Sequence, residues 1–298
     1  LYRLLDNEKK LFICCSGKKA KSTYSAINLA KKIKKKYPHL NICTVDADTV
    51  VEPRNEAYLI TEDINNRLKN YDVVITTSVL ETGVSIDIKN HFDAVLGFFS
   101  GNHTVDTVCQ MIERVRDNIP RYLYINKMGL SSIGNGSNSL RSLLFSTHKK
   151  TKAIIGELTQ SDLNQDLLEI DVNPCNDSLM AWAKRATFIN SQKYYYRDEI
   201  LEKLENDGYE LSFFEVEDKN IVDNIKTDMK NNKLASQHDE AIEICSKPSI
   251  SEQELDNLQM KKTKTRDERL TEEKAIIERK YLIDISPDLV KLNDDGFY

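Results

Sequence analysis

Two short stretches hold most of the side chains that suit a phosphate group. The first is Thr76-Thr77-Ser78-Val79-Leu80-Glu81-Thr82-Gly83-Val84-Ser85-Ile86-Asp87, which directly follows a predicted buried strand. Hydroxyl groups and backbone N–H groups at such a turn suit phosphate oxygens. The alternative is a plain strand-to-loop turn, in which the hydroxyls cap the backbone.

The second stretch is Gln110-Met111-Ile112-Glu113-Arg114-Val115-Arg116-Asp117, at the end of a predicted helix. Arginines bind phosphoryl oxygens with two hydrogen bonds at once, and they stabilise the charge that develops on a transferring γ-phosphate. The alternative is a pair of surface arginines in salt bridges with Glu113 and Asp117.

A third candidate is the group of lysines at 18, 19 and 21, which are expected to begin a helix after Ser16-Gly17. Cations at a helix N-terminus form an anion site, and solubility is an equally good explanation for them. The charge distribution suggests contact between the front of the chain and a polyanion, but on charge alone a solvated lysine-rich helix face is the favoured explanation. Residues 1–38 carry 11 Lys/Arg and 2 Asp/Glu, a net charge of +9, whereas residues 197–298 carry 16 Lys/Arg and 26 Asp/Glu, a net charge of −10.

The elements that would position these residues alternate between strand and helix. Short apolar runs predict buried strands at 11–15, 41–45, 71–76, 93–99 and 121–125, and helical patterns fill 17–37, 56–68 and 103–115. This alternation predicts an α/β fold with a doubly wound parallel sheet, in which ligands bind beyond the carboxyl ends of the strands.

The character of the chain changes after residue 127. A stretch rich in Gly, Ser and Asn predicts a linker at 128–148, followed by a helical accessory domain at 149–214 and a charged helical tail, extended or partly disordered, at 215–298. Within these regions we expect helices at 178–196 and 198–206, a strand at 209–214 and one long helix at 252–280.

Taken together and in this order, the stretches resemble motifs of superfamily 2 nucleic-acid helicases. The segment from Thr77 to Ile86 resembles motif V in its Thr-Asn-Ile-Ala-Glu-Thr-Ser-Leu-Thr-Ile form, and Gln110 to Arg116 resembles motif VI, Gln-x-x-Gly-Arg-x-x-Arg. Ser16-Gly17-Lys18-Lys19 stands where motif IV would. The resemblance covers residues 9–127 and implies a RecA-like fold, the second motor lobe of a helicase.

The resemblance also implies roles for individual residues. Arg114 and Arg116 would sense ATP, and Gln110 would orient the nucleotide or couple to the other lobe. The sequence departs from motif VI in two ways: Glu113 replaces the usual glycine, and the second arginine follows the first by two residues instead of three. Arg114 is therefore the stronger candidate of the two arginines. The remaining implied contacts are with the nucleotide for Gly83, Ser85 and Asp87, and with nucleic acid for Ser16, Lys18, Lys19, Thr76 and Thr77.

A narrower resemblance links the chain to the plasmid replication primase–helicases of cyanobacteria, which are distantly like herpesvirus origin-binding helicases. It rests on His91 to Asp106 (His-Phe-Asp-Ala-Val-Leu-Gly-Phe-Phe-Ser-Gly-Asn-His-Thr-Val-Asp), on Arg114 to Arg121, on Ile133-Gly134-Asn135-Gly136-Ser137 and on Tyr194-Tyr195-Tyr196-Arg197. It implies action in plasmid or phage-like DNA replication, with single-stranded DNA and a primase domain as partners.

The chain contains no GxxxxGK[ST] loop and no Asp-Glu metal motif after a strand. ATP with Mg²⁺ is therefore expected to be held mainly by a first RecA-like lobe upstream in the parent protein. A second hypothesis keeps the fold without turnover, as a binding or interaction module of a replication protein. A third, less favoured, is an unrelated nucleotide-binding α/β domain.

Other features carry less chemistry. Asp46-Ala47-Asp48 could hold a metal, but a pair like this more often caps a turn. Tyr194, Tyr195 and Tyr196 suit core or stacking roles. The six cysteines form no CxxC pair, and those in predicted strands are expected to behave as small buried hydrophobes. This cysteine pattern indicates a reducing, cytoplasmic compartment, and no apolar run approaches the length of a membrane span.

Overall fold

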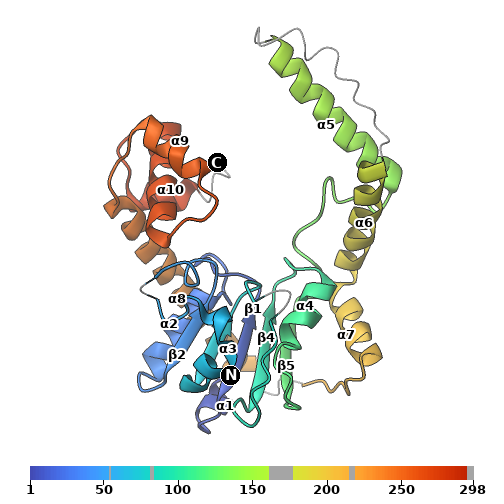
Figure 1. Ribbon diagram of the computed structural model, residues 1–298, viewed down its shortest axis with the longest axis vertical. Helices are drawn as coiled ribbons and strands as arrows, with labels where there is room; N and C mark the ends of the chain where they lie inside the picture. Colours follow the sequence, from blue (N-terminus) through green and yellow to red (C-terminus); the bar gives the residue numbers. More distant parts are fainter. Residues whose placement is uncertain (54, 81–83, 161–176, 215–218, 294–298) are drawn as a thin grey trace. The chain divides into compact units, whose positions relative to one another are not determined.

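The computed structural model describes residues 1–53, 55–80, 84–160, 177–214 and 219–293 (Figure 1). The chain forms two compact units. The first unit comprises Leu1–Phe98, Gln110–Tyr124 and Ser212–Tyr298, and the second comprises Phe99–Cys109 and Ile125–Leu211. The acidic tail therefore belongs to the same unit as the predicted sheet.

The expected α/β fold is confirmed. The sheet holds β1 (Leu11–Cys15), β2 (Ile42–Val45), β3 (Val73–Thr76), β4 (Ala94–Phe99) and β5 (Arg121–Ile125), in the order β2-β3-β1-β4-β5 (Figure 1). The pairings of β1 with β3, β1 with β4 and β2 with β3 are all parallel. The chain thus builds one half of the sheet on β3 and β2 before it crosses to β4, so the carboxyl ends of β1 and β4 flank the switch point of the topology.

The core of the first unit lies between the sheet and α2 (Ala26–Lys36), whose Leu29 and Ile33 are buried against the strands. The thiols of Cys14 and Cys15 in β1 are free and buried, as expected of small hydrophobes. Burial raises the pKa of Cys14 to about 12, because the thiolate is disfavoured away from water.

The expected start of the first long helix was wrong. The helix begins at Ala26 and its N-cap is Ser25, whose side chain accepts from the backbone N–H of Asn28. Residues 17–24 form a loop, held by the buried Asn28 amide, which donates to the carbonyls of Ala20 and Ser22 at 2.8 Å each. The lysines at 18, 19 and 21 therefore lie in this loop, called the lysine loop below, and not at a helix N-terminus.

The helix expected at 56–68 is also wrong. Short pieces replace it: η1 (Ile60–Glu62), α3 (Ile64–Arg67) and η2 (Leu68–Asn70). Leu59 adopts a left-handed conformation with φ +54°, which interrupts any longer helix. α4 (Val105–Ile112) then lies inside the helix expected at 103–115.

The second unit is mainly helical, with α5 (Leu140–Gln160), α6 (Asp177–Tyr194) and α7 (Tyr196–Asn206). The linker expected at 128–148 is only partly a loop, because α5 begins at Leu140. The preceding loop is tied to α6 by the buried Asn190, whose side chain accepts from the Ile133 N–H at 2.8 Å and donates to the Ser137 carbonyl at 3.1 Å.

The tail forms α8 (Lys219–Ser246), α9 (Glu252–Met260), α10 (Arg266–Tyr281) and α11 (Pro287–Asn293). The single helix expected at 252–280 is wrong, since α10 starts anew with a capping box in which Thr265 and Glu268 exchange hydrogen bonds. The expected strand at 209–214 is not formed, and Phe213 and Phe214 are exposed. No helix among the described residues combines the length and the apolar composition that crossing a membrane requires.

Candidate functional site

The carboxyl ends of β1 and β3 bring Ser16 and Thr76–Thr77 to one edge of the sheet. Parallel pairing sets Cys14 against Thr76, and the Thr77 N–H donates to the Val45 carbonyl at 3.1 Å. Ser16, Thr76 and Thr77 are all buried, and the Thr76 hydroxyl donates to the Thr77 carbonyl at 2.9 Å. The Thr76 hydroxyl therefore serves the turn itself, as the plain alternative for this stretch expected.

The two phosphate-suited stretches meet through a short parallel bridge between Ile86 and Val115. The Ile86 N–H donates to the Arg114 carbonyl at 2.9 Å, and the Arg116 N–H donates to the Ile86 carbonyl at 2.9 Å. The Arg114 Nη1 atom adds a hydrogen bond of 2.7 Å to the Val84 carbonyl. The bridge fixes Ser85 and Asp87 close to the two arginines, while Gly83 lies outside the described residues.

Two residues to which the sequence analysis gave no role, Arg121 and Asn65, stabilise the segments on either side of the bridge. The Arg121 guanidinium donates to four carbonyls at 2.8 to 3.4 Å. One is that of Ile112 at the end of α4, and the others are those of Val115, Asp117 and Ile119 in the segment 113–119, the arginine loop. Asn65 accepts from the Asp87 N–H at 2.8 Å and donates to the Ser85 carbonyl at 3.4 Å. Asn65 stands in none of the matched stretches, and Arg121 ends the stretch Arg114 to Arg121 but had no role assigned to it. Only the three-dimensional contacts show what the two residues do.

The side chains of Arg114 and Arg116 differ in burial and in their hydrogen-bond partners. Arg114 is half-buried and commits Nη1 to the Val84 carbonyl, whereas Arg116 is exposed. The carboxylate of Asp117 accepts from the Asn90 N–H at 2.8 Å and lies 3.5 Å from Lys89. These contacts, the Asn90 hydrogen bond first, lower the pKa of Asp117. Gln110 is also exposed, in the last turn of α4.

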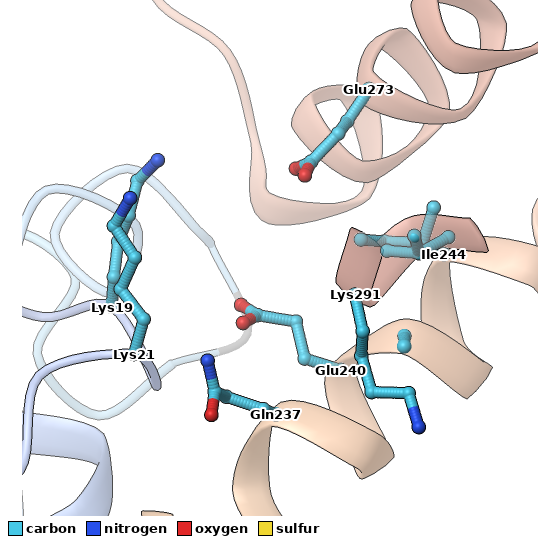
Figure 2. A pocket seen from close by; sticks show the side chains of 9 residues that line it. Lys19, Lys21, Gln237, Glu240, Ile244, Glu273 and Lys291 are labelled. Carbon is cyan, nitrogen blue, oxygen red and sulfur yellow. The ribbon is translucent and has the colours of Figure 1, made fainter. Parts of the chain in front are cut away.

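Carboxylates line the space in front of the lysine loop. The Lys18 ammonium lies 2.6 Å from Asp48, whose same oxygen lies 2.8 Å from Arg269 of α10. Lys19 and Lys21 line a pocket together with Gln237, Glu240 and Glu273. Figure 2 shows the two lysines on one side of this pocket, with the carboxylates of Glu240 and Glu273 extending into it from α8 and α10.

The tail also pairs with the lysines of α2. Lys31 lies 2.9 Å from Asp239, and Lys32 forms an ion pair with Asp228, both acids being on α8. Between them the Asn232 amide donates to the Asn28 carbonyl at 2.9 Å, and Met229 of the same helix joins the apolar core. The basic front therefore faces an internal set of carboxylates in the described structure.

The Asp46-Ala47-Asp48 segment is a capped turn. One oxygen of the buried Asp46 carboxylate accepts the backbone N–H groups of Asp48 and Thr49 at 2.9 and 3.1 Å. Asp48 is engaged by Lys18 and Arg269. These hydrogen bonds confirm the turn-capping role that the sequence favoured for this segment.

Comparisons with known proteins give relatives without an assigned activity. No family model matches the chain. An uncharacterized protein of Picosynechococcus sp. is 32% identical over 303 residues, which cover the whole of this chain and 30% of that relative. An uncharacterized protein of Ostreid herpesvirus 1, ORF115, is 37% identical over 67 residues, 20% of this chain and 26% of the relative. The chain is thus similar to less than a third of either protein.

Proposed function

We propose that residues 1–127 act as the second motor lobe of an ATP-dependent DNA helicase that works in plasmid or phage-like replication. The single observation that carries the proposal is the Ile86–Val115 bridge. It joins a hydroxyl-bearing loop beyond a parallel strand to an arginine loop, and a nucleotide-completing lobe needs these two parts side by side.

In this proposal Arg116 is the arginine that meets the γ-phosphate of ATP. Its side chain is exposed, while its backbone is pinned through the bridge and the Arg121 contacts. A charged group on a rigid frame stabilises a transition state without reorganisation at the moment of reaction. Arg114, with Nη1 on Val84, would position the loop. ATP with Mg²⁺ would be held mainly by a first lobe outside this chain.

Single-stranded DNA would be gripped through its backbone by the lysine loop, with a marked dependence on salt. Since Asp48, Glu240 and Glu273 line the same space as these lysines, the carboxylates of the tail would compete with phosphates for them. DNA binding would therefore require the tail acids to give way.

A second candidate is a binding module without turnover. The observation that favours it is Glu113, a half-buried carboxylate one residue before Arg114, which would repel a phosphate group. Both candidates share the fold and differ in what Arg116 does.

The deciding experiment is the DNA-stimulated ATPase rate of the full-length protein with Arg116→Ala. Loss of an arginine that stabilises the γ-phosphate lowers kcat by about 10³-fold or more. Arg3→Ala is the matched control, because Arg3 is exposed and lies on α1 (Tyr2–Leu5). An unchanged rate in Arg116→Ala contradicts the motor proposal and leaves the binding module.

A further inference from the structure

The loop that precedes α5 is built around a buried lysine of α6. The Lys193 ammonium donates to the carbonyls of Gly101 and His103 at 2.6 Å each and to the Ser131 hydroxyl at 3.4 Å. The packing is tight: an ideal Cβ on Gly129 would lie 2.2 Å from the Lys193 Cδ atom. Residues 128–136 are thus held in a defined conformation by Lys193. Ligand-binding loops are commonly held in this way by a rigid scaffold.

The charge of Lys193 has no carboxylate counterpart among the described residues. The side chain is buried, its hydrogen-bond partners are neutral oxygens, and the Tyr196 ring centroid lies 5.0 Å away. Burial lowers the pKa of Lys193 to about 8, so the ammonium is retained at neutral pH at an energetic cost. Buried charges are normally paired, and an unpaired one beside a pocket marks a candidate ligand site.

Such a pocket adjoins the lysine. Its volume is about 340 Å³, and its lining includes Lys193, Ser131, Asn135, Leu130 and Tyr194. Leu130 and Tyr194 expose 70% and 52% of their surfaces, so both side chains are accessible to a ligand in the pocket. The volume is at the small end of the range for small-molecule sites. The lining offers the positive charge of Lys193, neutral hydrogen-bonding groups and one half-exposed tyrosine.

We propose that this pocket binds one nucleotide unit of a single-stranded nucleic acid, with the base on the Tyr194 ring and the phosphate in the field of Lys193. An aromatic face stacks on a base whatever its sequence, and a cation without a counter-charge attracts a phosphate. The inference rests on the proposed function in naming DNA as the polymer. The pocket itself lies wholly within the second compact unit, whereas the arginine and lysine loops belong to the first.

The test compares neighbouring tyrosines in the full-length protein. Tyr194 lines the pocket, while Tyr195 is 66% exposed and follows it directly in sequence without lining the pocket. Two probes are used. Binding of 2′-deoxythymidine 5′-monophosphate is measured by NMR line broadening, and binding of a fluorescent oligothymidylate is measured by fluorescence anisotropy. Tyr194→Ala is expected to weaken both by about tenfold, Tyr195→Ala by less than about twofold, and Tyr194→Phe is expected to retain binding.

The outcomes separate the two proposals. Equal binding by Tyr194→Ala and Tyr195→Ala, or no mononucleotide binding by the wild type, overturns the pocket inference even if oligothymidylate binds elsewhere. Mononucleotide binding that depends on Tyr194, in a protein without DNA-stimulated ATPase activity, keeps the pocket inference and rejects the motor proposal.

Discussion

The charged contact between α8 and α2 yields a quantitative prediction about DNA binding. Asp228 and Asp239 pair with Lys32 and Lys31, and both acids are more than half exposed. Replacing them in the double variant Asp228→Asn/Asp239→Asn removes two negative charges with almost no change in side-chain volume. If the tail competes with phosphates, single-stranded DNA binds more tightly to this variant.

The magnitude follows from the exposure of the two acids, since only the Lys32 side chain is largely buried, at 12% exposed. Exposed ion pairs contribute about 0.2–1 kcal/mol each, so two of them contribute about 1 kcal/mol in total. A competition of that size corresponds to about a fivefold gain in affinity at moderate salt. Two freed lysines that contact phosphates would also steepen the salt dependence, by about 0.7 for each contact to a single strand.

The assay is fluorescence anisotropy of a labelled oligothymidylate with full-length protein across a salt series. Asp223→Asn is the matched control, because Asp223 is an exposed acid of the same helix that pairs with Lys226 of α8 itself. If the double variant and the control bind equally and share one salt slope, the tail does not compete for the basic front, and this part of the reasoning is wrong.

Three further predictions concern the frame and the pocket. Gly101→Ala is expected to lower the free energy of unfolding by about 2 kcal/mol or more, because Gly101 has φ +95° and its added Cβ would lie 2.7 Å from the Gly129 Cα. Gly17→Ala, with nothing within 4 Å of its Cβ, should stay within about 0.5 kcal/mol in the same urea titration. Arg121→Ala should speed amide hydrogen exchange in residues 113–119, since four carbonyls lose their donor, and unchanged protection would show that the bridge alone holds the loop. Because the pKa of Lys193 is lowered to about 8, mononucleotide affinity should fall several-fold between about pH 7 and about pH 9.5 as the ammonium loses its proton, and a flat profile would remove Lys193 from the site.

The strands could be predicted from sequence because their signal is local. β1 and β5 match the expected ranges, and β2, β3 and β4 differ from theirs only at the first residues. Each is a short, largely apolar run, and β1, β3 and β4 are buried along almost their whole length. Such runs can be recognised without knowledge of distant partners. The α/β architecture follows from their alternation with helices.

The errors arise where a distant or irregular contact decides the local structure. Ser16-Gly17 has the composition of a helix start, but the Asn28 side chain stabilises a loop there and Ser25 becomes the cap. The charged pattern after Glu252 continues in sequence, while the Thr265 capping box restarts the helix. The net charge of the tail was visible in the sequence, and its pairing with Lys31 and Lys32 was not.

The candidate site could be predicted only in part, because a distant contact decides how its pieces meet. The two stretches that suit phosphate were found by residue type and order, but their junction is a long-range bridge between Ile86 and Val115. The sequence also favoured Arg114 over Arg116, whereas the structure gives Nη1 of Arg114 a carbonyl partner and leaves Arg116 exposed. Asn65 carries no motif signal, and Arg121 was matched only as the last residue of the stretch Arg114 to Arg121, so residue types alone give neither of them a role.

The most direct test of the central claim is the affinity of the full-length protein for single-stranded DNA in two nucleotide states. A motor lobe that closes on ATP must change its grip between a non-hydrolysable ATP analogue and ADP, because a ligand shifts a conformational equilibrium only through differential affinity. The account predicts at least about a fivefold difference, abolished in Arg116→Ala and kept in Arg3→Ala. Equal DNA affinity in both nucleotide states would contradict it.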